Sequence, residues 1–326
     1  MNSQFYRTLK KPPSGTQYFL LTIDVEDWFQ VENFKAWIPS DSWSARELRV
    51  EKNTHGILDL LDAIQLNKPA PQSTIQNYPD SPKATFFVLG WIAARLPGLV
   101  REIHDRGHEV ASHGYGHQLC THMPVRRLKK DLGDSKKQLE DITGAPVDGY
   151  RAPSFSISTG ILRVIRECGY GYDSSYNSFS LNPRYGAISL NGFKKYGIAW
   201  QIDDDFFELP VSNLDFNFSR KSKFKMKNSK LPWGGGGYFR LMPLVVFRKG
   251  IRKILAKQNA YLFYLHPWEL DPKQPRVTEA APLYRFRHYA NLSATAKKLA
   301  RMIKAFARCR FISCSEYLRV IQASGI

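Results

Sequence analysis

The chain has 326 residues, of which 43% are hydrophobic and 13% are aromatic. This composition excludes a mainly disordered protein and is typical of a packed globular enzyme. The formal net charge is +18, from 47 lysines and arginines against 29 aspartates and glutamates. Such a charge attracts phosphates, anionic lipid headgroups, acidic glycans or nucleic acid without selecting among them.

Alternating strand and helix patterns run along most of the chain and predict a parallel sheet with helices outside it. Buried strands are expected at 18–23, 84–89, 109–112, just before Arg151, at 260–265 and from 311 onward. Helices are expected at 56–66, 91–106, 125–143, 158–169, 243–257, 294–306 and at the C-terminal end. Loop is expected at 68–83, and loop with short strands such as 206–211 at 171–243. The glycine run from Trp233 to Tyr238 is predicted to be turn or loop, and it lacks the lysine of a phosphate-binding loop.

The protein is expected in the cytosol, and this expectation includes a position at the inner face of the membrane. The apolar run from Tyr18 to Ile23 is too short for a signal peptide, and no stretch of about 18 uncharged apolar residues exists. Cys120, Cys168, Cys309 and Cys314 lack C-x-x-C spacing and are interpreted as reduced thiols. Basic clusters lie at 126–130, 220–230, 248–253 and 297–310. Each of them, considered alone, is interpreted as the solvated face of a helix.

Three acids follow the first predicted strand: Asp24, Glu26 and Asp27. Carboxylates at the C-terminal ends of parallel strands lie where such folds place active sites. Asp24 and Glu26 point to the same side of an extended strand, because side chains alternate with a period of two.

A histidine pair, His113 and His117, follows the third predicted strand, with two glycines between the rings. Either a helical or a curled loop geometry brings both imidazoles to one metal ion. One carboxylate and two histidines make three protein ligands, which leaves a position for water and is typical of catalytic metal sites. Two surface histidines are the alternative when the pair is considered alone.

Two further strand ends carry polar side chains. Arg151 is followed by Pro153, and a guanidinium there can hold a carboxylate ionised by paired hydrogen bonds, although a structural ion pair is equally consistent. His266 ends an apolar strand, and a histidine at that mouth could donate a proton near neutral pH. Trp28, Tyr115, Trp233 and Trp268 could stack on sugar rings or belong to the core.

These clusters, in this order, resemble the polysaccharide deacetylases of the NodB-homology family, carbohydrate esterase family 4. The resemblance runs from about residue 18 to residue 317 and is strongest to a subgroup of exopolysaccharide and exosortase loci. The motifs that carry the subgroup resemblance are Asp24-Val-Glu-Asp-Trp-Phe29, Gly234-Gly-Gly-Gly-Tyr-Phe-Arg240, His266-Pro-Trp-Glu269 and Phe286-Arg-His-Tyr-Ala-Asn291.

The resemblance implies a fold of the α/β class, a deformed (β/α) barrel with fewer than eight regular strands, and a divalent metal ion, commonly zinc. It implies Asp24 as the base, Arg151 as the residue that orients it, and His266 as the acid. His113 and His117 are implied as metal ligands, and the backbone N–H of Ser154 as an oxyanion donor. Val25 stands where the family has its carboxylate ligand, which leaves Glu26, favoured by its shared face with Asp24, or Asp27 for that role.

The implied reaction is metal-dependent de-N-acetylation of amino sugars in an exopolysaccharide or its lipid-linked precursor. The expected organisation is an N-terminal extension at 1–17, a catalytic domain at 18–318 with a subgroup-specific part from about 205, and a C-terminal end at 319–326. The expected partners are an N-acetylated glycan or lipid-linked oligosaccharide and the surface of an anionic membrane, without a specific nucleic acid. Two alternatives are a glycosidase that uses Asp24 and Glu269 as its carboxylate pair, and a basic protein that binds nucleic acid or a membrane surface.

Overall fold

The computed structural model describes residues 15–66, 81–179, 182, 184–216 and 229–324. The expected loop at 68–83, the basic stretch at 220–230 and the N-terminal extension at 1–17 therefore fall largely outside the described residues. Within them, the strands are β1 Tyr18–Val25, β2 Ala84–Val88, β3 Glu109–Ser112, β4 Gly149–Tyr150, β5 Tyr172–Asp173, β6 Lys194–Tyr196, β7 Ala199–Asp203, β8 Phe206–Glu208, β9 Leu214–Phe216, β10 Ser229–Leu231, β11 Ala260–Leu265 and β12 Arg310–Phe311.

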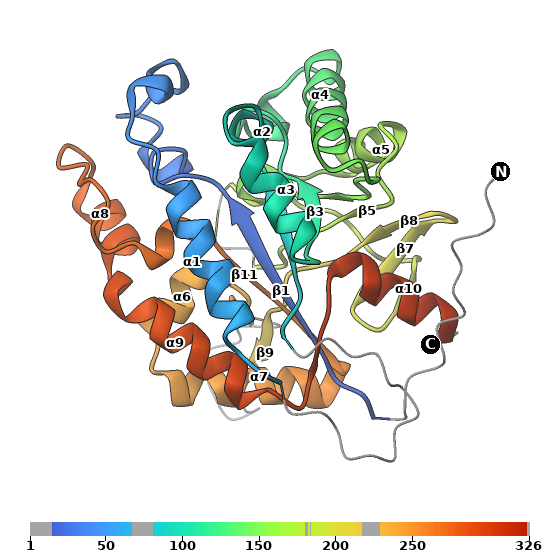
Figure 1. Cartoon of the computed structure of the whole chain (residues 1–326). Helices are drawn as coiled ribbons and strands as arrows, with labels where there is room; N and C mark the ends of the chain where they lie inside the picture. The colour runs from blue at the N-terminus through green and yellow to red at the C-terminus, as the bar shows by residue number, and fades with distance from the viewer. Residues whose placement is uncertain (1–14, 67–80, 180–181, 183, 217–228, 325–326) are drawn as a thin grey trace, which may run out of the picture.

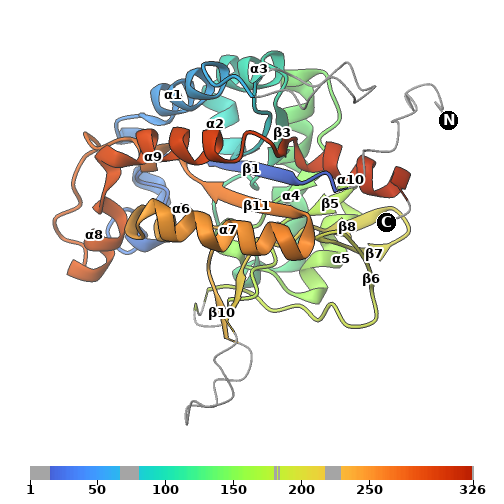
Figure 2. The ribbon, with the colours of Figure 1, turned by 90° about the horizontal axis from the view of Figure 1, so that it is seen from below.

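The helices of the same described ranges are α1 Val50–Asp62, α2 Gly90–Arg95, α3 Pro97–Asp105, α4 Val125–Thr143, α5 Thr159–Glu167, α6 Gly236–Leu241, α7 Leu244–Gln258, α8 Pro282–Tyr289, α9 Leu292–Ala305 and α10 Cys314–Ser324. Figure 1 shows α1 to α5 arranged in an arc outside the sheet, and Figure 2 shows α9 and α7 on either side of β1 and β11. Within the described residues, no helix is long and apolar enough to cross a membrane.

The main sheet follows the order β11-β1-β2-β3-β4-β5-β8-β7-β6, and β12 pairs with the start of β1. In the described part of the chain, the seven strands from β11 to β8 run parallel to one another. Strand β7 is antiparallel to β8, and β6 is antiparallel to β7. The sheet curls into an incomplete barrel with helices outside it (Figure 1). The prediction of a deformed α/β barrel with fewer than eight regular strands is confirmed.

The two faces of β1 belong to different parts of the core. Phe19, Leu21, Ile23 and Val25 join the cluster that packs against the outer helices. Leu20 joins a second cluster with side chains of the neighbouring strands, such as Phe87 of β2 and Leu262 of β11. Because strand side chains alternate, Thr22 and Asp24 continue the face of Leu20. The inner face of the sheet thus changes from apolar to polar toward the C-terminal ends of the strands.

The glycine run was expected to be turn or loop, and this prediction was wrong for its second half, because α6 begins at Gly236. Close packing explains the glycines. A Cβ on Gly236 would lie 2.3 Å from Oε1 of Glu269, and a Cβ on Gly235 would lie 2.7 Å from the hydroxyl of Tyr264. The run therefore lets α6 approach β11 and the segment that follows it.

Other boundaries also differ from the expectations. The helix expected at 91–106 is divided into α2 and α3 at Pro97, which cannot donate the hydrogen bond of a continuous helix. The helix expected from Gly56 begins at Val50. Helix α8, whose residues lack a clear apolar stripe, was not expected. The four cysteines are all free thiols, as expected.

Candidate active site

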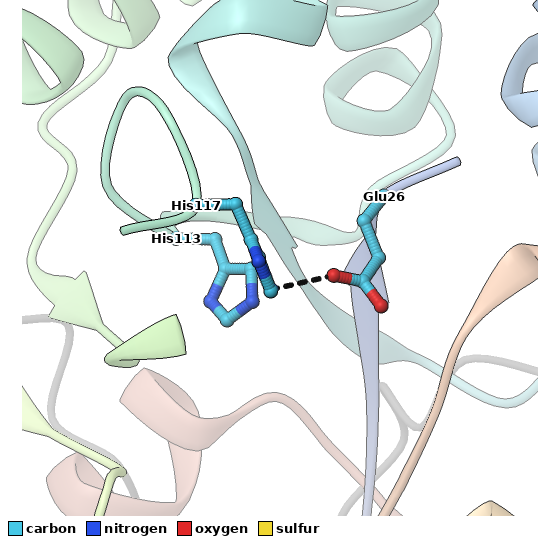
Figure 3. Close-up of side chains that lie close together, drawn as sticks. All are labelled: Glu26, His113 and His117. Atoms are coloured by element: carbon cyan, nitrogen blue, oxygen red, sulfur yellow. Dashed lines mark ion pairs between the residues drawn. The ribbon is translucent and has the colours of Figure 1, made fainter. Parts of the chain in front are cut away.

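Glu26, His113 and His117 form a buried cluster at the C-terminal ends of β1 and β3. Nε2 of His117 lies 2.7 Å from Oε2 of Glu26, and the two imidazole centroids are 5.4 Å apart. Figure 3 shows both rings and the carboxylate turned toward one another. At most 6% of each residue is exposed to solvent. The structure therefore brings together the histidine pair and one of the two acids considered as ligands.

The loop from His113 to His117 owes its shape to two residues with left-handed backbone. Gly114 has φ +74°, and His117 has φ 49°. The carboxylate of Asp131 on α4 accepts a hydrogen bond from the backbone N–H of Tyr115, at 2.9 Å. Left-handed backbone is uncommon for a histidine and persists only where its surroundings fix it, often at functional sites. Here it turns the second ring back toward the first.

The donor atoms of this cluster fit a divalent metal ion. One ligand atom from each of Glu26, His113 and His117 can be chosen so that all lie within 4.8 Å of one another. Nδ1 of His113 lies 2.8 Å from the carbonyl oxygen of Arg151 and so carries the proton, which leaves Nε2 available as a ligand. Oε1 of Glu26 accepts a hydrogen bond from the indole of Trp268, at 3.1 Å, and its other oxygen faces the histidines. Two imidazoles and one carboxylate are typical ligands of catalytic zinc.

Asp27 lies in a different environment from Glu26. Oδ2 accepts hydrogen bonds from the backbone N–H groups of Arg49 and Val50, at 2.7 and 2.8 Å. Oδ1 accepts from the N–H of Trp28. Burial, opposed by these donors, raises the pKa of the Asp27 carboxyl to about 6. Both oxygens are thus engaged at the start of α1, and Asp27 is not part of the metal-candidate cluster.

Asp24 and Arg151 form a fully buried ion pair beside this cluster. Nη1 of Arg151 donates to Oδ1 of Asp24 and to the hydroxyl of Thr22, both at 2.7 Å. The rest of the guanidinium donates to the carbonyl and the hydroxyl of Ser174, which follows β5. Five donor sites in a rigid fork suit this number of acceptors, so the arginine is fixed in place.

His266 stands at the mouth of the site, with 20% of its side chain exposed. Its Nε2 lies 3.9 Å from Oδ2 of Asp24 and 3.5 Å from Oε1 of Glu26. Its Nδ1 lies 2.9 Å from Oε1 of Glu269, whose other oxygen accepts from Nε of Arg240 at 2.7 Å. Arg240, Glu269 and His266 therefore form a chain of three charged groups that runs from the interior to the mouth of the site.

The local charges shift the pKa values of these groups strongly. Burial opposes the charge on Glu26, but His117, His266 and His113 outweigh it and hold the pKa of this carboxyl far below its usual range. Burial also opposes the charge on His266, yet Glu26, Glu269 and Asp24 raise its pKa to about 9. Burial lowers the pKa of His113 to about 4, so this ring is neutral, as a metal ligand must be.

Ser154 lies in the short 3-10 turn Pro153–Phe155, where Ser154 and Phe155 have φ values of 51° and 57°. Two residues separate it from Arg151, at the same end of the sheet. Consecutive left-handed residues are sparsely populated in proteins and cluster at functional sites.

The aromatic side chains considered as sugar platforms are mainly buried. Trp28, Trp233 and Trp268 are at most 7% exposed, and Trp233 stacks on Phe247 inside the core. Tyr115 is half-buried. Trp268 stacks on His266, with ring centroids 5.2 Å apart, in addition to its hydrogen bond to Glu26. The interpretation as core fits Trp28 and Trp233, whereas Trp268 supports the site.

Sequence reasoning assigned no role to Arg240, Ser174 or Thr22, and it considered Glu269 only as one of a glycosidase pair. Arg240 and Glu269 each lie in a motif that carried the family resemblance, and their place in these motifs was the sequence signal that could have identified them as functional residues. Their contact joins positions 29 residues apart and could not be read from either motif alone.

Comparisons with known proteins find relatives of parts of this chain. Residues 80–172 match the family model described as polysaccharide deacetylase, and residues 174–319 match a domain of unknown function, DUF3473. A Peptidoglycan-N-acetylglucosamine deacetylase of Bacillus cereus is 31% identical over 88 residues, which cover 27% of this chain and 41% of that protein. A Peptidoglycan deacetylase of Helicobacter pylori is 30% identical over 139 residues, which cover 40% of this chain and 47% of that protein.

This chain spans less than half the length of these curated relatives. A solved structure named for a polysaccharide deacetylase of Mycobacterium smegmatis has a TM-score of 0.56 at 17% identity, covers 97% of this chain and 94% of its own, and has the same fold. Residues 80–172 therefore belong to the polysaccharide deacetylase family, of the NodB-homology type, also called carbohydrate esterase family 4.

Proposed function

We propose that this protein is a metal-dependent deacetylase that removes acetyl groups from the amino sugars of an exopolysaccharide or its lipid-linked precursor. The observation that carries the proposal is the buried cluster of Glu26, His113 and His117 beside an aspartate held by an arginine. A three-ligand site next to a carboxylate base is the arrangement that metal-assisted hydrolysis requires. The names of the relatives, which refer to peptidoglycan deacetylation, support a glycan substrate.

A divalent ion, zinc by the choice of ligands, would be held by Glu26, His113 and His117 and would supply Lewis-acid polarisation of the acetamide carbonyl and acidification of water. Asp24 accepts the proton of the attacking water. Arg151 keeps this carboxylate ionised and fixes its direction through the paired donors described above. The backbone N–H of Ser154 donates to the oxyanion of the tetrahedral intermediate.

His266 then donates a proton to the departing nitrogen, because an amine anion is a poor leaving group. Its Nδ1 is engaged by Glu269, so the proton is delivered from Nε2, which faces Asp24 and Glu26. Water adds to the acetyl carbon, the C–N bond breaks, and acetate and a free amino sugar result. Asp24 takes one proton of the water, and the amine receives one from His266. Transfer of the proton from Asp24 to His266 restores both side chains, and the second proton of the water leaves with the acetic acid product, which ionises to acetate.

The glycosidase alternative is less consistent with the geometry. Glu269 would have to supply a proton, yet Arg240 and His266 outweigh the effect of burial and lower the pKa of this carboxyl. Hydrolysis by a carboxylate pair needs no metal ion, so loss of activity after chelation separates the two functions.

The first test is the metal content per chain, measured by elemental analysis after incubation with zinc. About one ion per chain is expected for the parent protein, and little for His113→Ala or His117→Ala. His122→Ala is the matched control, because His122 is exposed and lies outside the cluster. Acetate release from N-acetylated glycans should follow metal content. A parent protein without metal, or one whose metal persists in both variants, would refute the assignment of ligands.

We further propose that the protein works at the cytoplasmic face of a membrane, in contact with anionic lipid. Val245 on α7 and Leu283 and Phe286 on α8 are between 61% and 64% exposed. Basic residues adjoin them in sequence: Arg248, Lys249, Arg285 and Arg287. Apolar side chains among cations suit a surface of anionic headgroups. Binding to phosphatidylglycerol vesicles that weakens with salt is expected, and equal binding to neutral vesicles would contradict this proposal.

A further inference from the structure

A cavity of about 660 Å³ lies outside the metal-candidate cluster and is lined in part by Lys195 of β6 and Trp200 of β7. Pro210, Val211, Ser212 and Asn213, which follow β8, line one part of it, and Gln258, which precedes β11, lines another. The hydroxyl of Ser212 accepts a hydrogen bond from the backbone N–H of Leu262, at 2.9 Å, and so ties this segment to β11. The volume lies within the range of about 300–1,000 Å³ typical of small-ligand sites.

The lining of this cavity carries uncompensated positive charge. Lys195 and Lys230 contribute to it, and neither makes an ion pair within the described part of the chain. The carboxylate of Asp215 also lines it, but it is paired with Lys257. Burial, together with the charges of Lys230 and Lys257, lowers the pKa of Lys195. Three cations around one carboxylate leave a net attraction for an anion.

Polar and aromatic side chains complete the wall of this cavity, among them Asn213. It is only 9% exposed, and its Nδ2 donates to Oδ1 of Asn177 and the hydroxyl of Ser178, both at 2.9 Å. These two bonds fix the amide, and its Oδ1 has no partner among the described residues. The half-buried ring of Trp200 lines the same cavity, with Nζ of Lys195 5.4 Å from its centroid.

The cavity lies close to the catalytic centre along one loop. Ser174 binds the guanidinium of Arg151, and Ser178, four residues later, lines the cavity. Four residues span at most about 14 Å, so Ser178 lies within that distance of Ser174.

We propose that this cavity binds an anionic sugar, a glycan unit that carries a carboxylate or a phosphate. The lysines select the anion, and the indole of Trp200 offers a flat apolar surface to the C–H face of a sugar ring. The choice of a sugar rests on the proposed deacetylase function, whereas the choice of an anion rests on the lining of the cavity alone.

The test is calorimetric titration of the full chain with probes that carry no N-acetyl group and are therefore not consumed. The probes are trigalacturonate, glucose 6-phosphate and neutral maltotriose, and binding of either anionic probe but not maltotriose is expected. Lys195→Gln and Lys230→Gln should each weaken the binding about tenfold, because each removes a charge-assisted contact. Lys194→Gln is the matched control, since Lys194 is also on β6 but lies over the ring of Tyr196, outside the cavity.

The relative strength of the two anionic probes identifies carboxylate or phosphate as the preferred group. Equal losses in Lys194→Gln and Lys195→Gln would show diffuse charge and overturn the inference, as would failure of both anionic probes to bind. If no N-acetylated glycan is deacetylated but binding depends on Lys195, the proposed function fails and the cavity site stands. If deacetylation occurs but the lysine variants bind like their parent, the cavity site fails alone.

Discussion

The carbonyl oxygen of Arg151 lies 2.8 Å from Nδ1 of His113, while the guanidinium of the same residue is paired with Asp24 at 2.7 Å. One residue therefore positions a candidate metal ligand through its backbone and the candidate base through its side chain. The two functions can be separated experimentally, because a substitution at this position changes the side chain and leaves the carbonyl in place.

Arg151→Lys should keep the metal ion and lose activity. A lysine retains the charge but cannot reproduce the fork that binds Asp24, Thr22 and Ser174 together. Acetate release is expected to fall about 10- to 100-fold, the range found when a residue that orients a metal site is replaced. Metal content, measured on the same preparation, should stay near that of the parent. A variant with full turnover would show that the orientation of Asp24 is not limiting.

Glu26→Gln and Asp27→Ala should have opposite effects. Glu26→Gln removes the anionic ligand with little change of shape, so bound metal should be lost. Asp27→Ala removes the acceptor of three backbone N–H groups and should lower the free energy of unfolding by about 1–3 kcal/mol while metal binding persists. Elemental analysis and denaturant unfolding of both variants check this. Retention of metal by Glu26→Gln together with its loss from Asp27→Ala would reverse the two assignments.

Local patterns predicted much of the fold because β1, β3 and β11 are buried strands and each is followed by polar residues. Parallel strands place their C-terminal ends at one edge, so the convergence of Asp24, His113, Arg151 and His266 followed from order alone. The start of α1 did not follow, since its N-terminal N–H groups are bound by Asp27, more than 20 residues earlier in the chain.

Long-range contacts explain what the sequence did not reveal about the site. Arg240 binds Glu269 on one side and the carbonyl oxygens of Arg287, His288 and Ala290 on the other. No periodic pattern encodes such a contact between a glycine-rich helix start and the end of α8. The same packing requires a glycine at position 236, so the glycine run is a consequence of tertiary structure.

Glu269→Gln should impair amide hydrolysis by disturbing the position of His266. The carboxylate of Glu269 binds Nδ1 of His266 at 2.9 Å and Nε of Arg240 at 2.7 Å. The side chains of Glu269 and Arg240 are buried, whereas that of His266 is partly exposed. Removing the charge leaves Arg240 without its anion, which should cost about 3–5 kcal/mol of folding free energy.

The measurement is the ratio of acetate release from an N-acetylated glycan to that from an activated acetate ester, whose leaving group needs no proton. His266→Ala should lower the amide rate much more than the ester rate, and Glu269→Gln should shift the ratio in the same direction. An equal loss on both substrates would remove His266 from the acid role.

Acid should destabilise the protein through His108, a buried histidine that precedes β3 at the end of the sheet away from the candidate site. Its Nδ1 accepts a hydrogen bond from the N–H of Ala84 at 3.2 Å, and burial, together with Lys83, lowers its pKa from 6.5 to about 4. The unfolded chain therefore gains this proton near pH 6.5 and the folded chain only near pH 4. Stability is complete above pH 6.5, falls by about 3 kcal/mol as the pH drops to 4, and receives no further contribution below that. In His108→Gln, whose side chain can accept the same bond but does not titrate, this part of the pH dependence of urea unfolding should disappear, and an unchanged pH profile would contradict the assignment.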